Sequence, residues 1–136
     1  MTTYTPSRES TPSVEWLAEG LAARLSLPDG GFTIHARTRE EPTTGFAVAV
    51  RPHLSKVLPV AEVTAEVLAR YIRRVSAFRD LSVGGWHDPE TGLVHLDLSV
   101  VVQGIELAFA IGRDKQQLAI FDLAAGQSIP VPPLAA

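Results

Sequence analysis

The chain has 136 residues, 46% of them hydrophobic and 20% charged, so it can bury a core of ordinary size and is not wholly disordered. Its 12 Lys and Arg residues against 15 Asp and Glu residues give a net charge of −3, which argues against a protein whose main task is to coat nucleic acid. The lack of cysteine excludes disulfides, thiolate catalysis, zinc fingers and iron–sulfur clusters. No apolar run approaches the ~20 residues of a membrane span, which predicts a soluble, cytoplasmic protein.

The two ends of the chain differ in composition from its middle. Residues 1–13 are rich in Thr, Ser and Pro and offer almost nothing to bury, which predicts a flexible arm without the apolar run of a signal peptide. Residues 129–136 contain three prolines and predict a tail, because proline cannot continue a helix or a central strand. The length of the remainder predicts one domain, over residues 14–128.

The first predicted elements are a helix over residues 14–25, which Ser13 can cap, and two short strands over 32–37 and 46–51. The residues between the two strands predict a hairpin loop that joins them. The apolar stripe of the helix is Trp16, Leu17, Leu21 and Leu25. The predicted inward residues of the strands are Phe32, Ile34, Ala36, Phe46, Val48 and Val50.

A long helix and a second hairpin follow. Apolar residues recur at spacings of three and four over residues 62–79, which is typical of an amphipathic helix. Residues 83–88 and 93–102 then alternate as two strands around a turn in which Gly92 can take the left-handed conformation. The expected register places Trp86 opposite His95 and His87 opposite Val94, so the two histidines face apart.

Residues 104–117 fit either of two structures. Their apolar residues alternate as in a strand, yet residues 113–117 are good helix formers and favour a helix. A strand over 118–123 and a short last strand after Gly126 complete the order. The sequence therefore predicts an α+β fold, an antiparallel sheet of about five to six strands with two to three helices mainly on one face.

Several segments carry a family resemblance that covers most of the chain, from about residue 30 to 129. They read GGFTI from residue 30, PTTGFAV from 42, GGWHDPETG from 84, LDLS from 96 and QLAIFDL from 117. In these segments the chain resembles small uncharacterised proteins of actinobacteria and of their phages, plasmids and related mobile elements. Relatives of that kind carry a more charged helix before the Gln, where residues 105–111 here are nearly all apolar. The resemblance implies no activity; it implies an accessory role on a mobile element, such as inhibition of a host-defence complex.

The candidates for chemistry are His87, His95 and Asp97, with His35 on another strand. A metal site needs about three or four convergent ligands, and the predicted register brings only two together, so neither a metal nor another cofactor is expected. A small hydrolase or metal-dependent enzyme using His95 and Asp97 is the enzymatic alternative. The sequence contains no nucleophile elbow, phosphate-binding glycine loop or metalloprotease motif, so no residue is assigned a catalytic role. Gly84 and Gly85 indicate a bulge or a close approach of backbones.

A basic edge of the predicted helix 62–79 is formed by Arg70, Arg73 and Arg74. Such an edge can meet phosphates or an acidic partner, which makes a nucleic-acid-associated accessory protein a second alternative. An ordinary surface explains it equally well, because Glu66 and Arg70 are spaced as an i,i+4 ion pair.

The second face of the predicted sheet combines an aromatic side chain, small alanines and both signs of charge. Interfaces favour Trp and Arg anchors beside small residues, so this face is the leading candidate for binding a protein partner. Its candidate binding residues are His35, Arg37, Arg51, Trp86, His95 and Asp97. The opposing interpretation is that the first helix covers this face, with Trp86 in the core and Asp97 paired with Arg37 or Arg51. The leading hypothesis is a small non-enzymatic protein-binding module that uses this face or the helix edge; a homodimer formed through an exposed strand edge is a further alternative.

Overall fold

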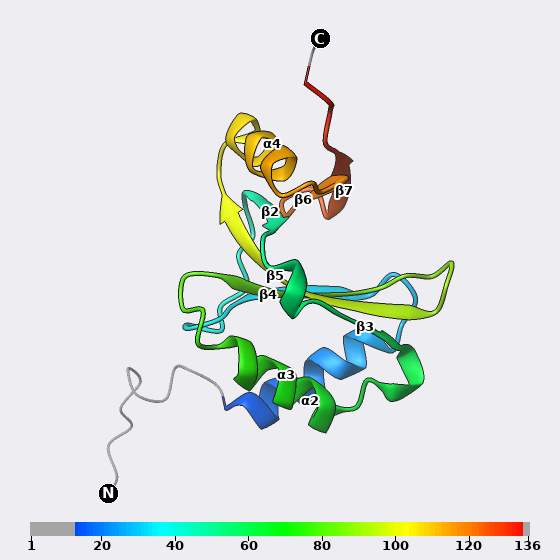
Figure 1. The fold of residues 1–136 in the computed structure, drawn as a ribbon. Helices are drawn as coiled ribbons and strands as arrows, with labels where there is room; N and C mark the ends of the chain where they lie inside the picture. The colour runs from blue at the N-terminus through cyan, green and yellow to red at the C-terminus, as the bar shows by residue number, and fades with distance from the viewer. Residues whose placement is uncertain (1–12, 135–136) are drawn as a thin grey trace, which may run out of the picture.

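The computed structural model describes residues 13–134 and is an α+β fold, a twisted antiparallel sheet of seven strands with its helices packed on one face (Figure 1). The helices are α2 (Val14–Leu25), α3 (Ala65–Val75) and α4 (Ile105–Asp114). The strands are β1 (Gly31–His35), β2 (Phe46–Ala49), β3 (Lys56–Pro59), β4 (Ser82–His87), β5 (Leu93–Val102), β6 (Ala119–Asp122) and β7 (Gln127–Pro130). The short 3₁₀ helices η1 (Pro52–Leu54) and η2 (Val60–Glu62) flank β3. No helix of the described part is long and apolar enough to cross a membrane.

The long strand β5 organises the sheet, because it pairs with three others. Its first half lies between β4 and β3 and its second half pairs with β2, in the order β1-β4-β5-β2-β6-β7 with β3 also on β5. The predicted hairpin of residues 32–37 with 46–51 is therefore wrong, since β1 pairs with β4 while β2 pairs with β5 and β6. Alternation decides which side chains share a face but not which strand lies alongside, and the connecting loop is long enough to cross the sheet.

The second predicted hairpin is confirmed, with its register. β4 pairs with β5 so that Trp86 lies opposite His95 and His87 opposite Val94. Gly92 closes the turn at a φ of 72°, in the left-handed region that glycine adopts at no steric cost. Turn chemistry and alternation agree here, which is why the local sequence suffices to predict the pairing.

The larger core lies between the sheet and the helix pair α2 and α3, which pack side by side under β1, β4 and the first half of β5 (Figure 1). Ala18, Leu21 and Leu25 are the buried residues of α2. Trp16 does not belong to this stripe and is 67% exposed. It precedes Ala18 by two residues, about 200° around the helix, so it points away from the sheet.

A smaller second core is covered by α4, the helix that the composition of residues 104–117 favours. Its buried centre is formed by Val48, Ala108 and Ile120, from β2, α4 and β6. Alternate residues of β5 supply both cores, so α4 packs on the same sheet face as α2 and α3. The twist turns that face between the two halves of β5, so in Figure 1 α4 is seen above the sheet and α2 and α3 below it. The apolar stretch 105–111 is accounted for by this packing.

The fold extends beyond the predicted boundary at residue 128. Ile129 and Pro130 belong to β7, and Ile129 and Val131 pack against the second core. Pro130 is tolerated because β7 is the edge strand of the sheet. Of the predicted arm, only Ser13 lies within the described residues, where its hydroxyl accepts a hydrogen bond from Trp16 N and caps α2.

β3 has no counterpart among the predicted strands. It is four residues long, begins shortly after η1 and ends on Pro59, and Val57 within it is 53% exposed. An element this short, with little to bury, has no recognisable period. The long predicted helix is also shorter than expected, since residues 60–62 form η2 and α3 ends at Val75.

Thr64→Ala is expected to lower the free energy of unfolding by ~1 kcal/mol. Thr64 Oγ1 accepts a hydrogen bond of 3.1 Å from Val67 N, which satisfies a free donor at the start of α3. Urea denaturation of the variant measures the loss. Thr43→Ala, in an exposed loop, is the matched control and should change stability by less than ~0.5 kcal/mol. Equal stabilities of the two variants would contradict the capping role.

Candidate functional site

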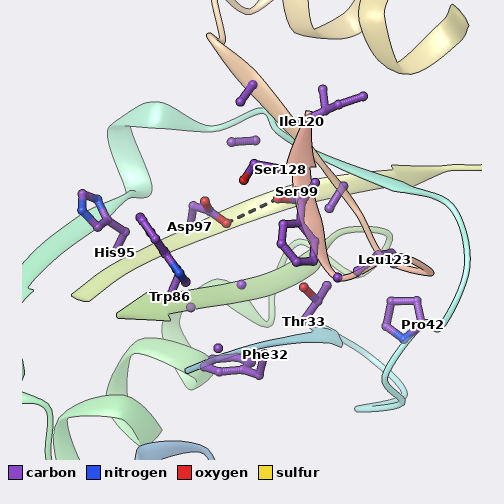
Figure 2. Close-up of a pocket in the computed structure, with 18 of the residues that line it drawn as sticks. Phe32, Thr33, Pro42, Trp86, His95, Asp97, Ser99, Ile120, Leu123 and Ser128 are labelled. Carbon is purple, nitrogen blue, oxygen red and sulfur yellow. Dashed lines mark hydrogen bonds between the residues drawn. The ribbon is translucent and has the colours of Figure 1, made fainter. Parts of the chain in front are cut away.

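The sheet face opposite the helices is hollowed into a groove of about 440 Å³ (Figure 2). Residues of β4 and β5 form its floor, β1 contributes Phe32 and Thr33 on one side, and β6 and β7 contribute Phe121 and Ser128 on the other. Both cores lie on the other face of the sheet. The strong twist therefore leaves a trough that crosses several strands.

Small residues make room for this groove. Ala47 and Ala49 of β2 and Gly84 of β4 line it. A Cβ atom at Gly84 would lie 2.8 Å from Asp97 Oδ1, so a larger residue there would displace the carboxylate. Gly85 lies on the core face, where a Cβ would meet the Phe32 ring at 2.5 Å. The glycine pair thus serves close packing on both faces of an unbroken strand, which is the close approach expected of it, without a bulge.

Trp86 stands in the groove wall, 41% exposed, and is held by two contacts. Its Nε1 donates a hydrogen bond of 2.7 Å to Asp29 Oδ1. Its ring packs against His95 with 5.9 Å between centroids and 30° between the ring planes. These contacts limit the rotamers of an exposed indole, so a ligand that packs on it loses little side-chain entropy.

Asp97 lies on the groove floor and carries a perturbed carboxyl group. Burial raises its pKa from 3.8 to about 6, against the lowering effects of the Ser99 hydrogen bond and of the charge of His95. Ser99 Oγ donates to Asp97 Oδ1 over 3.3 Å (Figure 2). No ion pair within the described residues involves Asp97. At pH 7 it is a mostly ionised carboxylate without a neutralising cation.

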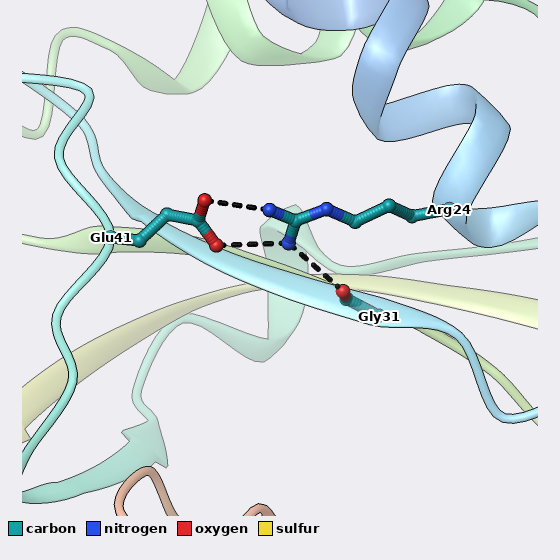
Figure 3. Close-up of polar contacts among 3 residues, drawn as sticks. All are labelled: Arg24, Gly31 and Glu41. Atoms are coloured by element: carbon teal, nitrogen blue, oxygen red, sulfur yellow. Dashed lines mark hydrogen bonds and ion pairs between the residues drawn. The ribbon is translucent and has the colours of Figure 1, made fainter.

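Glu41, on the groove rim, differs from Asp97 in that an arginine pairs with its carboxylate. Arg24 of α2 reaches past the β1 edge and donates two hydrogen bonds to its carboxylate, of 2.9 and 2.6 Å, and one of 3.3 Å to Gly31 O (Figure 3). This fork geometry is the stronger form of an Arg–carboxylate contact. The pair ties the loop before β2 to α2 and neutralises the charge of Glu41.

The groove brings together only part of the predicted sheet-face set. Trp86, His95 and Asp97 line it, whereas His35, Arg37 and Arg51 are not among its lining residues. His35 Nδ1 accepts hydrogen bonds from the backbone N–H groups of Arg37 and Thr38 in the turn after β1. The Arg51 guanidinium lies 5.1 Å from the centre of the Phe78 ring. Both arginines follow the end of a strand, where alternation no longer determines direction.

The interpretation in which the first helix covers this face is wrong. α2 packs in the larger core on the other face, and Asp97 bonds to Ser99 rather than to Arg37 or Arg51. His87 is buried on the core face, where its Nδ1 lies 2.8 Å from Leu25 O. Within the described residues, no group of three or more His, Asp or Glu side chains is placed to hold a metal ion.

The predicted helix edge is largely engaged in ion pairs. Arg70 pairs with Glu66 over 3.2 Å, and Arg73 pairs with Glu15 of α2 over 2.8 Å, which lowers the pKa of the Glu15 carboxyl. Arg74 is exposed. The edge therefore helps to join α2 and α3, as an ordinary surface does.

No family model, curated protein or solved structure matches the chain.

Part of the groove has no recognisable signature in the sequence. Asp29, Glu41 and Phe121 line it beside the predicted residues. Alternation with the buried Ile120 indicates that Phe121 points to the second face. The sequence gives no sign that β6 pairs with β2. That pairing places Phe121 on the side of the groove opposite β1 and β4.

Proposed function

We propose that the protein is a small cytoplasmic, non-enzymatic binding module whose groove receives a segment of a protein partner. The observation that carries the proposal is Trp86, an exposed tryptophan held by a hydrogen bond and a ring contact in the wall of an open groove on the helix-free face. Tryptophans in such settings are the residue type most often found to dominate binding energy. The resemblance to proteins of mobile elements extends the proposal to an accessory role, with a host-defence complex as the partner.

The form of the groove suits an extended segment. Its lining runs from β1 to β7 across the sheet, and neighbouring strands lie ~4.8 Å apart, so the trough is long for its volume. Ala47, Ala49 and Gly84 allow a backbone to approach closely. A few residues of extended chain, at ~3.3 Å each, would occupy it.

The contacts of the two candidate catalytic residues favour binding over catalysis. His95 packs against the Trp86 ring, and Asp97 accepts its hydrogen bond from Ser99. A general acid–base pair needs a histidine oriented by its carboxylate within hydrogen-bond reach. The His95 ring is instead oriented by its contact with Trp86.

Selection of a displayed library of random extended peptides against the protein is expected to yield ligands that depend on the groove. Trp86→Ala, which removes the wall, and Ala49→Leu, which fills the floor, should each weaken the selected peptides at least tenfold. Fluorescence anisotropy measures the affinities, and circular dichroism confirms that each variant is folded.

Trp16→Ala is the matched control, because Trp16 is an exposed tryptophan on α2, away from the groove. It should leave the affinities unchanged. Peptides that bind Trp86→Ala as tightly as the wild type, or that lose affinity on Trp16→Ala, would place the binding site elsewhere.

A further inference from the structure

The permanent charges among the residues that line the groove have one sign, and His95 is the basic side chain beside them. The acidic lining residues of the groove are Asp29, Glu41 and Asp97, and among the described residues that line it none is Lys or Arg. The Glu41 charge is neutralised by Arg24, and Asp29 is occupied by the Trp86 indole N–H. Asp29 keeps its charge but is exposed to solvent, where that charge is screened, so the more buried Asp97 carboxylate is the group that gains most from a cationic ligand.

Asp97 has a deficit that a cation would fill. Among the described residues, its side chain accepts one hydrogen bond, from the neutral Ser99 hydroxyl at 3.3 Å, which is long for an O–H donor to a carboxylate. A partly buried carboxylate with so little compensation costs folding free energy. A cation that reaches the groove floor is attracted by the Asp97 carboxylate. Folding has already removed most of the water around that carboxylate, so binding adds little further desolvation cost for it.

The wall beside this carboxylate is aromatic. Trp86 and His95 form a tilted ring pair, and the indole is the aromatic group that attracts cations most strongly. Guanidinium is planar, stacks on such rings and donates in a fork that matches a carboxylate, whereas ammonium does neither. The three requirements of charge, stacking and directed donation are met together by arginine.

We propose that the groove binds an arginine side chain carried by the partner's extended segment, its guanidinium placed between the Trp86 indole and the Asp97 carboxylate. This inference rests on the proposed function, since it names the chemistry that the groove selects. It assigns Trp86 to stacking and Asp97 to charge pairing, and it gives the segment a basic anchor rather than an acidic one.

The peptide library supplies the test. Peptides whose binding depends on Trp86 are expected to share an arginine at one position. In the tightest of them, replacing that arginine with citrulline, which keeps the shape and removes the charge, should weaken binding about tenfold. Asp97→Asn should weaken the arginine peptide by a similar factor, and the two changes together should cost little more than either alone.

Asp80→Asn is the matched control, because Asp80 is an exposed carboxylate outside the groove; it should not discriminate arginine from citrulline. Trp86-dependent peptides without a shared arginine, or losses from citrulline and Asp97→Asn that multiply independently, would overturn the arginine assignment and leave the proposed function standing. A selection without any Trp86-dependent peptide would overturn both. The citrulline change is made on the peptide, so its outcome does not depend on the folding of a variant.

Discussion

Asp97→Asn is expected to raise the free energy of unfolding by on the order of 2 kcal/mol at pH 7. Burial raises the pKa of Asp97 from 3.8 to about 6 in the folded protein, so the ionised form is less favourable there than in the unfolded chain. At pH 7 the folded protein carries that penalty nearly in full. Asparagine has a similar shape and no charge to desolvate.

The pH dependence has a definite sign. Below about pH 4 Asp97 is protonated in the folded and the unfolded protein and does not affect stability. Between about pH 4 and 6 the folded protein binds more protons at Asp97, so the free energy of unfolding falls as pH rises. Above about pH 6 that loss of stability is constant. Urea denaturation from pH 4 to 8 should show this fall in the wild type and a smaller one in Asp97→Asn. His95 and Tyr71 act on or respond to the Asp97 charge, so the difference curve measures the loss of Asp97 together with its effect on these two neighbours. Asp80→Asn should leave the profile unchanged, and a variant less stable than the wild type at pH 8 would contradict the expectation.

Gly30→Ala is expected to cost about 3 kcal/mol or more of unfolding free energy. A Cβ at Gly30 would lie 1.9 Å from Arg24 O and 2.9 Å from Leu27 O, both backbone atoms that cannot rotate away. Gly30 is also held by two backbone hydrogen bonds of 2.9 Å, one to Leu27 O and one from His87 N. Relief of the overlap must therefore separate the end of α2 from β1 and β4.

Gly20→Ala provides a control with the opposite sign. Gly20 lies inside α2, and a Cβ there would meet no atom within 4 Å. The higher helix propensity of alanine should raise the unfolding free energy by roughly 0.5–1 kcal/mol. Thermal and urea denaturation measure both variants, and equal stabilities would show that the approach of α2 to Gly30 is not tight in solution.

Local sequence patterns predict correctly those features of the fold that one short segment determines by itself. The helix stripe of Leu21 and Leu25, and the turn closed by Gly92, agree with the structure because spacing and turn conformation are properties of neighbouring residues. The placement of Trp86, His95 and Asp97 on one face follows from alternation along β4 and β5 joined by that turn. His35, Arg37 and Arg51 lie at or beyond strand ends and do not line the groove; turn hydrogen bonds hold His35, and a ring contact holds Arg51.

The sequence by itself determined the α+β character, most of the elements and the side of the sheet on which Trp86 and Asp97 lie, since these depend on periods of two and 3.6 residues. Only the tertiary structure decided that β1 pairs with β4, that β2 lies between β5 and β6, and that the twist of the sheet curls the helix-free face into a groove. The physical reason is that every strand offers the same backbone donors and acceptors. The choice among partners is therefore made by long-range packing of α2, α3 and α4 on the opposite face, and no single segment contains it.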